Sequence, residues 1–576
     1  MANKKGKRSS AAAGAYDEGH GLAYPSGLAL QENRPWLLHS VRSTVKLLLL
    51  SLFWLIPVLA CNATDQLLDQ NESLVPADSD VDRNKAIYLS GGQPRTLDPA
   101  MTHGGAYGPV GGIFSGLVTL NSDLQVQPEL AHGWEVSDDG TLYTFYIRPD
   151  ARFHDGRPVT AQDFVYSWER AANPLLGSDT VQTYLGDVVG IDEVISGGSD
   201  HISGLRVVDD HTLEVRIDAP KAYFLSKLTY PVAYVVDKEN VDRLDWEHDP
   251  NGTGAFELQE WEDDEYIILR RNDGYNGLPP AIDHLVYLMG AGIPLSMYEK
   301  GEIDVVGVGG SNLERVQDPN NPLHQDLRVG VDMCTSYVVF NSDQAPFNDP
   351  LVRQAFSYAL DKERIVDGLF MGDALVAEGP LPPGMPGYTG DLDGYNYNPE
   401  KAKETLARAG YDDPSSLPAV TFNTSGYGSV GPYVTSLISM WQETLGVTIE
   451  PILLDPYLFI DELYSGNTGD IFLSGWCADY PDPENFLDLL YHSTSKQNLG
   501  SYNNPAIDGL LEEARIEPDV GTRMDQYAEI ERMIVEDAPA VFLTHSLAAE
   551  LVKPYVENYV WTPIGVAQWH QVEIDR

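Results

Sequence analysis

The chain has 576 residues, of which 43% are hydrophobic and 21% charged, so it can bury a large core and divide into two or three domains. Lysine and arginine total 37 against 86 aspartate and glutamate residues, and the net charge of −49 repels phosphate backbones, which argues against nucleic acid as a partner. The 31 Tyr, 16 Phe and 10 Trp are too many large apolar side chains for an acidic disordered protein. The composition indicates a globular protein with an acidic, solvated surface.

An apolar stretch near the N-terminus has the composition of an export signal. The fourteen residues 47–60 are apolar except for Ser51, follow Lys46, and end in Val58-Leu59-Ala60-Cys61. A signal-anchor helix is the alternative, but the stretch is short of the roughly 20 residues that span a hydrocarbon core. The pattern resembles bacterial lipoprotein signals, in which the cysteine is diacylated and the chain is cleaved before it, and two acyl chains give stable anchoring.

We therefore expect a leader and signal peptide over 1–60, lipidation at Cys61, and a flexible, polar and acidic tether over 61–85. The expected location is extracytoplasmic, with the protein anchored by lipid to the bacterial membrane. The leader before Lys46 is long for such a signal. Either a misplaced start codon or a disordered cytoplasmic extension accounts for it.

Strand and helix signals alternate from Ala86 onward without an internal repeat, which favours an α/β architecture. Residues 142–147 are apolar on both faces and predict a well-buried strand. Thr160, followed by Asp163 at the third position, predicts the start of a helix whose apolar stripe faces the core. Further elements are predicted as strands over 212–217 and 266–269 and as a helix that begins after Asn398 and ends near Gly410.

Residues 426–431, Gly-Tyr-Gly-Ser-Val-Gly, form a G-x-G-x-x-G pattern between a predicted strand and a predicted helix. Asp455 follows a second predicted strand over 447–454. This is the arrangement of a dinucleotide site, in which glycines admit the pyrophosphate to a helix N-terminus. The alternative is a glycine-rich loop between a strand and a helix, because the pattern arises easily by chance in a chain with 52 Gly.

Catalytic and metal-binding motifs do not stand out elsewhere. H-E-x-x-H, G-x-S-x-G and G-x-x-x-x-G-K-[ST] do not occur, and the 13 His are scattered. The three Cys are too few for a disulfide scaffold and wrongly spaced for zinc. Carboxylates are numerous, but no glycosidase pair can be singled out among them. The sequence predicts no catalytic residue, no cofactor and no metal.

The most informative segment is 475–486, Gly-Trp-Cys-Ala-Asp-Tyr-Pro-Asp-Pro-Glu-Asn-Phe. It follows a predicted buried strand over 470–473 and turns through two prolines, so it should lie where a strand leaves its sheet. Ligand-binding groups of α/β proteins gather at such strand ends. The alternative is that the Trp and the first Asp serve packing and turn formation only.

This segment resembles the corresponding one of bacterial extracellular solute-binding proteins, family 5, the oligopeptide-binding proteins of peptide ABC transporters. Other motifs match in the same order, and the match runs from about Ala86 to the C-terminus. They are Thr96-Leu97-Asp98-Pro99, the run from Asp155 to Trp168, Gly301-Glu302-Ile303-Asp304, Pro346-Phe347-Asn348-Asp349 and Leu551-Val552-Lys553-Pro554. These motifs are more specific than G-x-G-x-x-G, so residues 426–431 are interpreted as an ordinary loop.

The resemblance implies an α/β, bilobed periplasmic-binding-protein-like fold with three domains, of the type II, large peptide-binding subclass. It implies a non-enzymatic protein that acts as a monomer, captures short peptides and delivers them to the permease subunits of an ABC importer. We expect domain I over 86–128, 250–333 and 549–576, domain II over 129–249, and domain III over 334–548.

The resemblance also assigns site residues. Two backbone walls hold an extended peptide by strand addition, one formed by His103, Gly104 and Gly105 and the other by Gly475, Trp476 and Cys477. Asp479 matches the carboxylate that pairs with the peptide α-ammonium, and Tyr457 matches an aromatic pocket wall. Cys334 and Cys477 match a bridged pair, and export to an oxidising compartment would allow that disulfide to form.

Some positions depart from the pattern of the family. His103 replaces a carboxylate, and Tyr464 and Leu473 replace two arginines that bind the C-terminal carboxylate of the ligand in well-known members. The length of the cargo, and the peptide nature of the cargo, therefore stay open at this stage. A binding protein for an oligosaccharide is the nearest alternative, and a secreted dinucleotide-dependent or hydrolytic enzyme is the alternative from another class.

Overall fold

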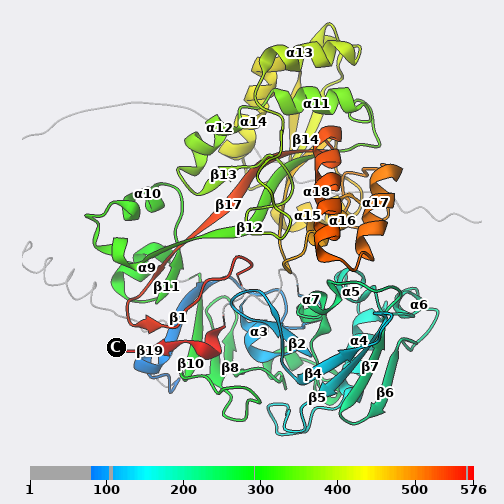
Figure 1. Cartoon of the computed structure of the whole chain (residues 1–576). Coiled ribbons are helices and arrows are strands. Elements are labelled where there is room, and N and C mark those ends of the chain that lie inside the picture. Colours follow the sequence, from blue (N-terminus) through cyan, green and yellow to red (C-terminus); the bar gives the residue numbers. More distant parts are fainter. Residues whose placement is uncertain (1–78, 103–107, 291, 566–567) are drawn as a thin grey trace, which may run out of the picture. The chain divides into compact units, whose positions relative to one another are not determined.

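The computed structural model describes residues 79–102, 108–290, 292–565 and 568–576 (Figure 1). The signal, Cys61 and the predicted wall of His103, Gly104 and Gly105 lie outside the described residues. Strand β1 begins at Ala86, but the last residues of the predicted tether are already structured. They form the short helix η1 (Arg83–Lys85), and the Arg83 guanidinium lies 3.0 Å from the carboxylate of Asp304.

Most strands of the described chain join one mixed sheet of eleven strands, in the order β15-β14-β16-β12-β17-β11-β1-β10-β9-β8, with β13 paired to β17. Their bounds are β1 (Ala86–Gly91), β8 (Phe256–Glu262), β9 (Tyr266–Arg271), β10 (His284–Met289), β11 (Val305–Gly307), β12 (Leu327–Phe340), β13 (Ala374–Val376), β14 (Val420–Ser425), β15 (Ile449–Leu454), β16 (Ile471–Cys477) and β17 (Ala540–Val552).

Two long strands hold this sheet together. Strand β12 has 14 residues and β17 has 13, and they pair in antiparallel fashion from Leu327 opposite Leu551 to Val339 opposite Ala540 (Figure 1). At one end β17 also pairs with β11, and at the other end β12 also pairs with β16. The sheet therefore connects the strands near the N-terminus with those near residue 471 through main-chain hydrogen bonds.

A separate four-stranded antiparallel sheet has the order β4-β5-β7-β6, formed by β4 (Ala131–Val136), β5 (Leu142–Ile147), β6 (Leu205–Asp209) and β7 (Thr212–Arg216). The predicted strands in this region are confirmed. The prediction of burial on both faces of β5 is only half right, because Tyr143, Phe145 and Ile147 are buried while the residues between them are half-buried. Two short hairpins complete the strands, β2 (Val118–Leu120) with β3 (Val126–Pro128) and β18 (Val556–Glu557) with β19 (Glu573–Ile574).

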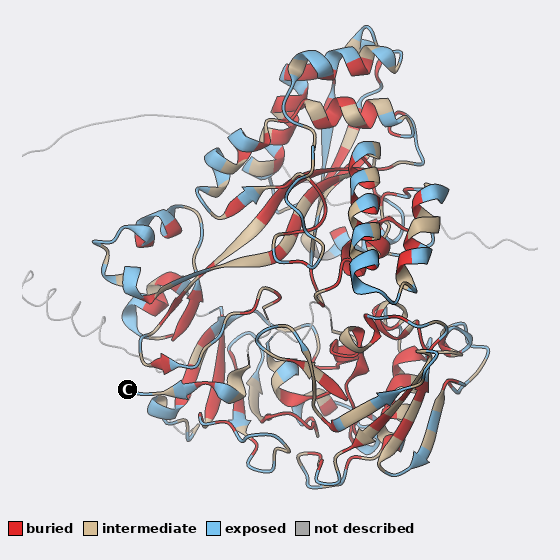
Figure 2. Ribbon diagram, in the orientation of Figure 1, coloured by how far each residue is buried: buried red, intermediate tan, exposed pale blue. Residues whose placement is uncertain are grey.

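Helices pack against the sheets, and several of them bury one face and expose the other (Figure 2). Those before β12 are α3 (Pro109–Ile113), α4 (Ala161–Ala172), α5 (Val181–Leu185), α6 (Ile191–Ile195), α7 (Phe224–Lys227), α8 (Lys238–Val241), α9 (Pro294–Lys300) and α10 (Ser311–Gln317). Those after it are α11 (Pro350–Tyr358), α12 (Lys362–Ile365), α13 (Pro399–Arg408), α14 (Pro432–Leu445), α15 (Pro456–Tyr464), α16 (Glu484–Tyr491), α17 (Pro505–Arg515) and α18 (Val520–Asp537).

The helix starts follow the predicted capping chemistry. Thr160 and Asp163 form a reciprocal capping box at the start of α4, and Trp168 of the same helix is fully buried. Asn398 caps α13, and Gly410 follows the C-cap Ala409 with a φ of 95°, so it marks the end of the helix as predicted. No helix within the described ranges combines the length and the hydropathy that a membrane span requires.

Candidate peptide-binding site

Strand β16 presents an unpaired edge. On one side it pairs with β12 along its whole length, from Ile471 opposite Phe340 to Cys477 opposite Cys334. On the other side β14 pairs only with Ile471 and Phe472. From Gly475 to Cys477 no described strand occupies that second side, so these residues offer main-chain groups to an added strand.

The strand extends further than the sequence suggested. We predicted that it ends near residue 473 and that Gly475, Trp476 and Cys477 follow it, but all three belong to β16. The prediction failed because Gly has low strand propensity and interrupts the apolar run, whereas pairing with β12 decides the local structure. Gly475 and Cys477 are exposed and Trp476 is half-buried.

A disulfide bond fixes the end of this edge. The sulfur atoms of Cys334 and Cys477 are bonded at 2.01 Å, and the two Cα atoms lie 4.0 Å apart across β12 and β16. The bond spans 143 residues, and closing a loop of that length stabilises the fold by about 5 kcal/mol in the loop-entropy treatment. The last residue of the open edge is thereby tied to its neighbouring strand.

Asp479 lies two residues after the end of this edge, and hydrogen bonds fix both its backbone and its carboxylate. Its backbone N–H donates to Oδ1 of the fully buried Asn485 at 3.0 Å, and the indole N–H of Trp476 donates to the same oxygen at 3.2 Å. The hydroxyl of Tyr184 donates to the Asp479 carboxylate at 2.6 Å. No lysine or arginine of the described residues forms an ion pair with this carboxylate. Burial raises the pKa of Asp479 to about 6, against the lowering effect of the Tyr184 hydrogen bond.

Tyr184 is a site residue that sequence reasoning missed. It lies on α5, 295 residues before Asp479. Its ring stacks on Tyr230 with centroids 3.6 Å apart and meets Tyr480 edge-on at 6.3 Å. Burial raises the pKa of the Tyr184 hydroxyl, and the nearby Asp479 carboxylate adds to the rise, so the group stays protonated as a donor.

The remaining predicted residues have less defined roles in the structure. Tyr457 lies on α15, but its side chain is outside what the structure describes. Tyr464, which replaces an arginine of well-known family members, donates its hydroxyl to Gln497. Residues 426–431 form the loop between β14 and α14, as their alternative interpretation predicts.

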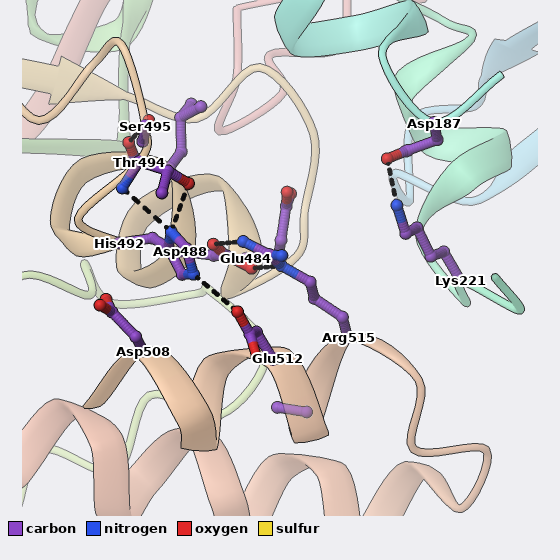
Figure 3. Close-up of polar contacts among 12 residues, drawn as sticks. Asp187, Lys221, Glu484, Asp488, His492, Thr494, Ser495, Asp508, Glu512 and Arg515 are labelled. Carbon is purple, nitrogen blue, oxygen red and sulfur yellow. Dashed lines mark hydrogen bonds and ion pairs between the residues drawn. The ribbon is translucent and has the colours of Figure 1, made fainter. Parts of the chain in front are cut away.

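A cluster of buried charges lies just beyond Asp479. The Lys227 ammonium, at the end of α7, lies 3.2 Å from the carboxylates of both Asp187 and Glu484. Lys221 also pairs with Asp187, at 2.6 Å (Figure 3). Arg515 of α17 holds Asp488 of α16 in a bidentate pair (Figure 3). The Lys227 contacts tie the start of α16 to the segment that carries Tyr184, and the Arg515 pair ties α16 to α17.

The comparisons with known proteins agree with this geometry. Residues 125–498 match the bacterial extracellular solute-binding proteins, family 5 Middle. The chain is 32% identical over 496 residues to the periplasmic oligopeptide-binding protein OppA of Escherichia coli, covering 83% of this chain and 90% of that protein. It is 28% identical to the dipeptide-binding protein of the same organism, covering 85% and 94%.

Among solved structures, the chain is similar to the murein tripeptide binding protein MppA of Escherichia coli, with a TM-score of 0.76, 26% identity and coverage of 86% of this chain and 99% of that chain. The predicted α/β, bilobed periplasmic-binding-protein fold is confirmed by this likeness. The named relatives are binding proteins. The chain therefore belongs to the family 5 extracellular solute-binding proteins of bacteria.

Proposed function

We propose that the protein is the substrate-binding lipoprotein of an ABC importer, which captures short peptides and delivers them to the membrane permease without chemical turnover. The domain boundaries proposed are those of the sequence, with domain I over 86–128, 250–333 and 549–576, domain II over 129–249, and domain III over 334–548. In this scheme Tyr184 belongs to domain II and Asp479 to domain III, so a ligand at Asp479 is enclosed between the two.

The observation that carries the proposal is a half-buried carboxylate that has no cationic partner among the described residues and lies at the end of an open strand edge. The Asp479 carboxylate accepts the neutral hydroxyl of Tyr184, and no lysine or arginine of the described residues pairs with it. A peptide α-ammonium supplies the missing charge and forms a charge-assisted hydrogen bond, about twice as strong as a neutral one. The carboxylate thereby fixes the first residue of the ligand.

The edge from Gly475 to Cys477 then accepts the peptide backbone as an added strand. Main-chain hydrogen bonds are insensitive to side-chain identity, so this part of the site tolerates many sequences. His103, Gly104 and Gly105 are the proposed opposite wall, and Tyr457 is the proposed aromatic wall of a side-chain pocket. The named cargoes of the relatives, oligopeptides and dipeptides, support this class of ligand.

Mass spectrometry of ligand retained on gentle purification tests the proposed cargo. We expect a mixture of short peptides with free N-termini from the native protein, and a strongly reduced amount from Asp479→Asn purified in parallel. Recovery of an oligosaccharide, or of N-terminally blocked peptides in equal amount from both proteins, would contradict the proposal.

Lipid attachment is tested separately at Cys61. The Cys61→Ser variant should leave the membrane fraction or keep an uncleaved signal, because no thioether can form at serine. Intact-mass analysis of the N-terminal peptide measures both outcomes. A variant that remains membrane-bound with a normally cleaved, unmodified N-terminus would exclude the proposed anchor.

A further inference from the structure

A cavity whose wall does not include Asp479 lies among the strands near the N-terminus. It has a volume of about 440 Å³. Its wall combines segments far apart in the sequence: the end of β1, the start of α3, strand β11, the last part of β17, and the C-terminal residues around Trp561 and Trp569. Gly307 of β11 lies directly opposite Glu550 of β17 in this wall.

Two carboxyl groups line this cavity, together with the polar side chains of Ser90, Ser115, Thr119, Gln568 and His570. Glu129 and Glu550 line it, and neither lysine nor arginine is among its described lining residues. Each carboxylate receives a tyrosine hydroxyl, from Tyr275 to Glu129 at 2.5 Å and from Tyr559 to Glu550 at 2.8 Å. Arg148, which lies nearby, donates its Nε hydrogen to the backbone oxygen of Glu129. The cavity thus holds two carboxyl groups whose hydrogen-bond partners there are neutral.

Two further polar atoms of the wall lack partners. The Tyr287 hydroxyl and the indole N–H of Trp561 are buried, and none of the described residues forms a hydrogen bond with either. Tyr287 is only 7% exposed, so water does not satisfy its hydroxyl freely. An unpartnered buried polar group costs about 1–3 kcal/mol, which a ligand group that bonds to it would recover.

The apolar part of the wall is aromatic. Besides the tyrosines already named, the rings of Phe114, Tyr234, Phe256, Trp561 and Trp569 line the cavity. Aromatic faces attract cations, and the attraction grows where water is excluded. Carboxylates and aromatic rings in a wall that contains no described lysine or arginine form the chemistry that recognises an organic cation, an ammonium or a guanidinium group. Arg148, outside the wall, attracts the Glu129 carboxylate but leaves its side-chain oxygens to Tyr275 and a ligand.

We propose that this cavity binds the cationic side chain of an arginine or lysine residue in the captured peptide, between Glu129 and Glu550. The source of the cation rests on the proposed function. A peptide is favoured as the source because the cavity lies close in sequence to the proposed peptide wall. Gly108 and Pro109 of the cavity wall follow closely after Gly105, the last residue of the proposed peptide wall. A free organic cation has the same charged group, and the experiment distinguishes it from a peptide side chain.

Paired tripeptides test the proposal on the unmodified protein. Ligand-stripped protein is titrated by calorimetry with Ala-Ala-Ala tripeptides that carry arginine at one of the three positions, each compared with its citrulline counterpart, which has nearly the same shape but no charge. We expect at least one arginine peptide to bind about tenfold to 100-fold more tightly than its citrulline partner, as charge-assisted hydrogen bonds imply. Agmatine alone is titrated in parallel.

Two variants test whether Glu129 and Glu550 cause the preference for arginine over citrulline peptides. Glu129→Gln and Glu550→Gln preserve side-chain shape, and each should reduce the ratio between arginine and citrulline peptides while leaving the affinity for Ala-Ala-Ala unchanged. Glu404→Gln, on the exposed face of α13, removes one charge elsewhere and should leave the ratio unchanged. Retained binding of Ala-Ala-Ala shows that a variant is folded.

The outcomes separate the two proposals. Binding of agmatine but of no peptide would support the cation site and contradict the proposed cargo. Equal affinities for every arginine and citrulline pair, with no agmatine binding, would overturn the cation site even if the peptides bind. A preference for arginine that both glutamine variants retain would overturn it as well.

Discussion

Two carboxyl groups five residues apart, the half-buried Asp479 and the buried Glu484, differ in what neutralises them. Both accept a tyrosine hydroxyl, from Tyr184 and Tyr480 respectively. Burial raises the pKa of Asp479 to about 6 and that of Glu484 to about 7. Glu484, however, has the Lys227 ammonium 3.2 Å away, whereas Asp479 has no described cation.

The comparison shows that a raised pKa does not by itself identify a ligand site. Burial also lowers the pKa of the Lys227 ammonium, but Asp187 and Glu484 overcome this effect and raise it above its ordinary value. The counter-charge of Glu484 is therefore part of the chain, and this cluster stabilises the fold. The counter-charge of Asp479 is left for the ligand to supply, which is why we assign it to binding.

Removing Lys227 tests whether the carboxylate that has a counter-charge within the chain stabilises the fold. Lys227→Met leaves Asp187 and Glu484 buried with less positive charge and should lower the free energy of unfolding by about 3–5 kcal/mol. Chemical denaturation of ligand-stripped protein measures it. Lys403→Met, on the exposed face of α13, is the matched control and should change little. A loss below about 1 kcal/mol for Lys227→Met would show that the cluster is not structural.

Neutralising Asp479 should raise the free energy of unfolding of the ligand-free protein, whereas removing Lys227 should lower it. Its folded pKa of about 6 exceeds the unfolded value of about 3.9, so folding disfavours the ionised carboxylate above pH 6. Asp479→Asn should therefore raise the free energy of unfolding at pH 7.5 by about 1–2 kcal/mol. The gain should shrink as the pH falls through 6 toward 4, where the wild-type carboxyl is itself neutral. A destabilised Asn variant at pH 7.5 would mean that the carboxylate already has a cationic partner.

Peptide affinity should depend on pH with the same midpoint. Below about pH 6 the carboxyl of the empty protein is protonated and must lose its proton before it pairs with an ammonium. The association constant should fall by nearly tenfold per pH unit below 6. Titrations between pH 5 and 7.5 measure this slope, and Asp479→Asn should abolish it. An equal slope in both proteins would assign the titration to another group.

Local chemistry made much of the fold predictable. Thr160 with Asp163 and Asn398 with Pro399 predicted the starts of α4 and α13, because capping depends on a few neighbouring residues. The alternation in 142–147 predicted β5 for the same reason. The extension of β16 to Cys477 was missed, because it depends on pairing with a strand more than a hundred residues earlier.

The site divides in the same way. Asp479 could be singled out because it stands in a distinctive segment that matches a family. No sequence motif marks Tyr184 or Lys227 as a site residue, since a tyrosine on a short helix and a lysine at a helix end are common in any protein. Only the fold brings them within hydrogen-bonding distance of Asp479 and Glu484.

Calorimetry with one peptide in free and N-acetylated form tests the role of Asp479 most directly. Acetylation removes the ammonium, so the wild-type protein should bind the acetylated peptide more weakly by about 2–5 kcal/mol, and Asp479→Asn should bind the free peptide more weakly by a similar amount. The two losses should not add, because both remove the same ion pair. Equal affinity of the wild-type protein for the free and the acetylated peptide would contradict the assignment of Asp479 to the peptide N-terminus.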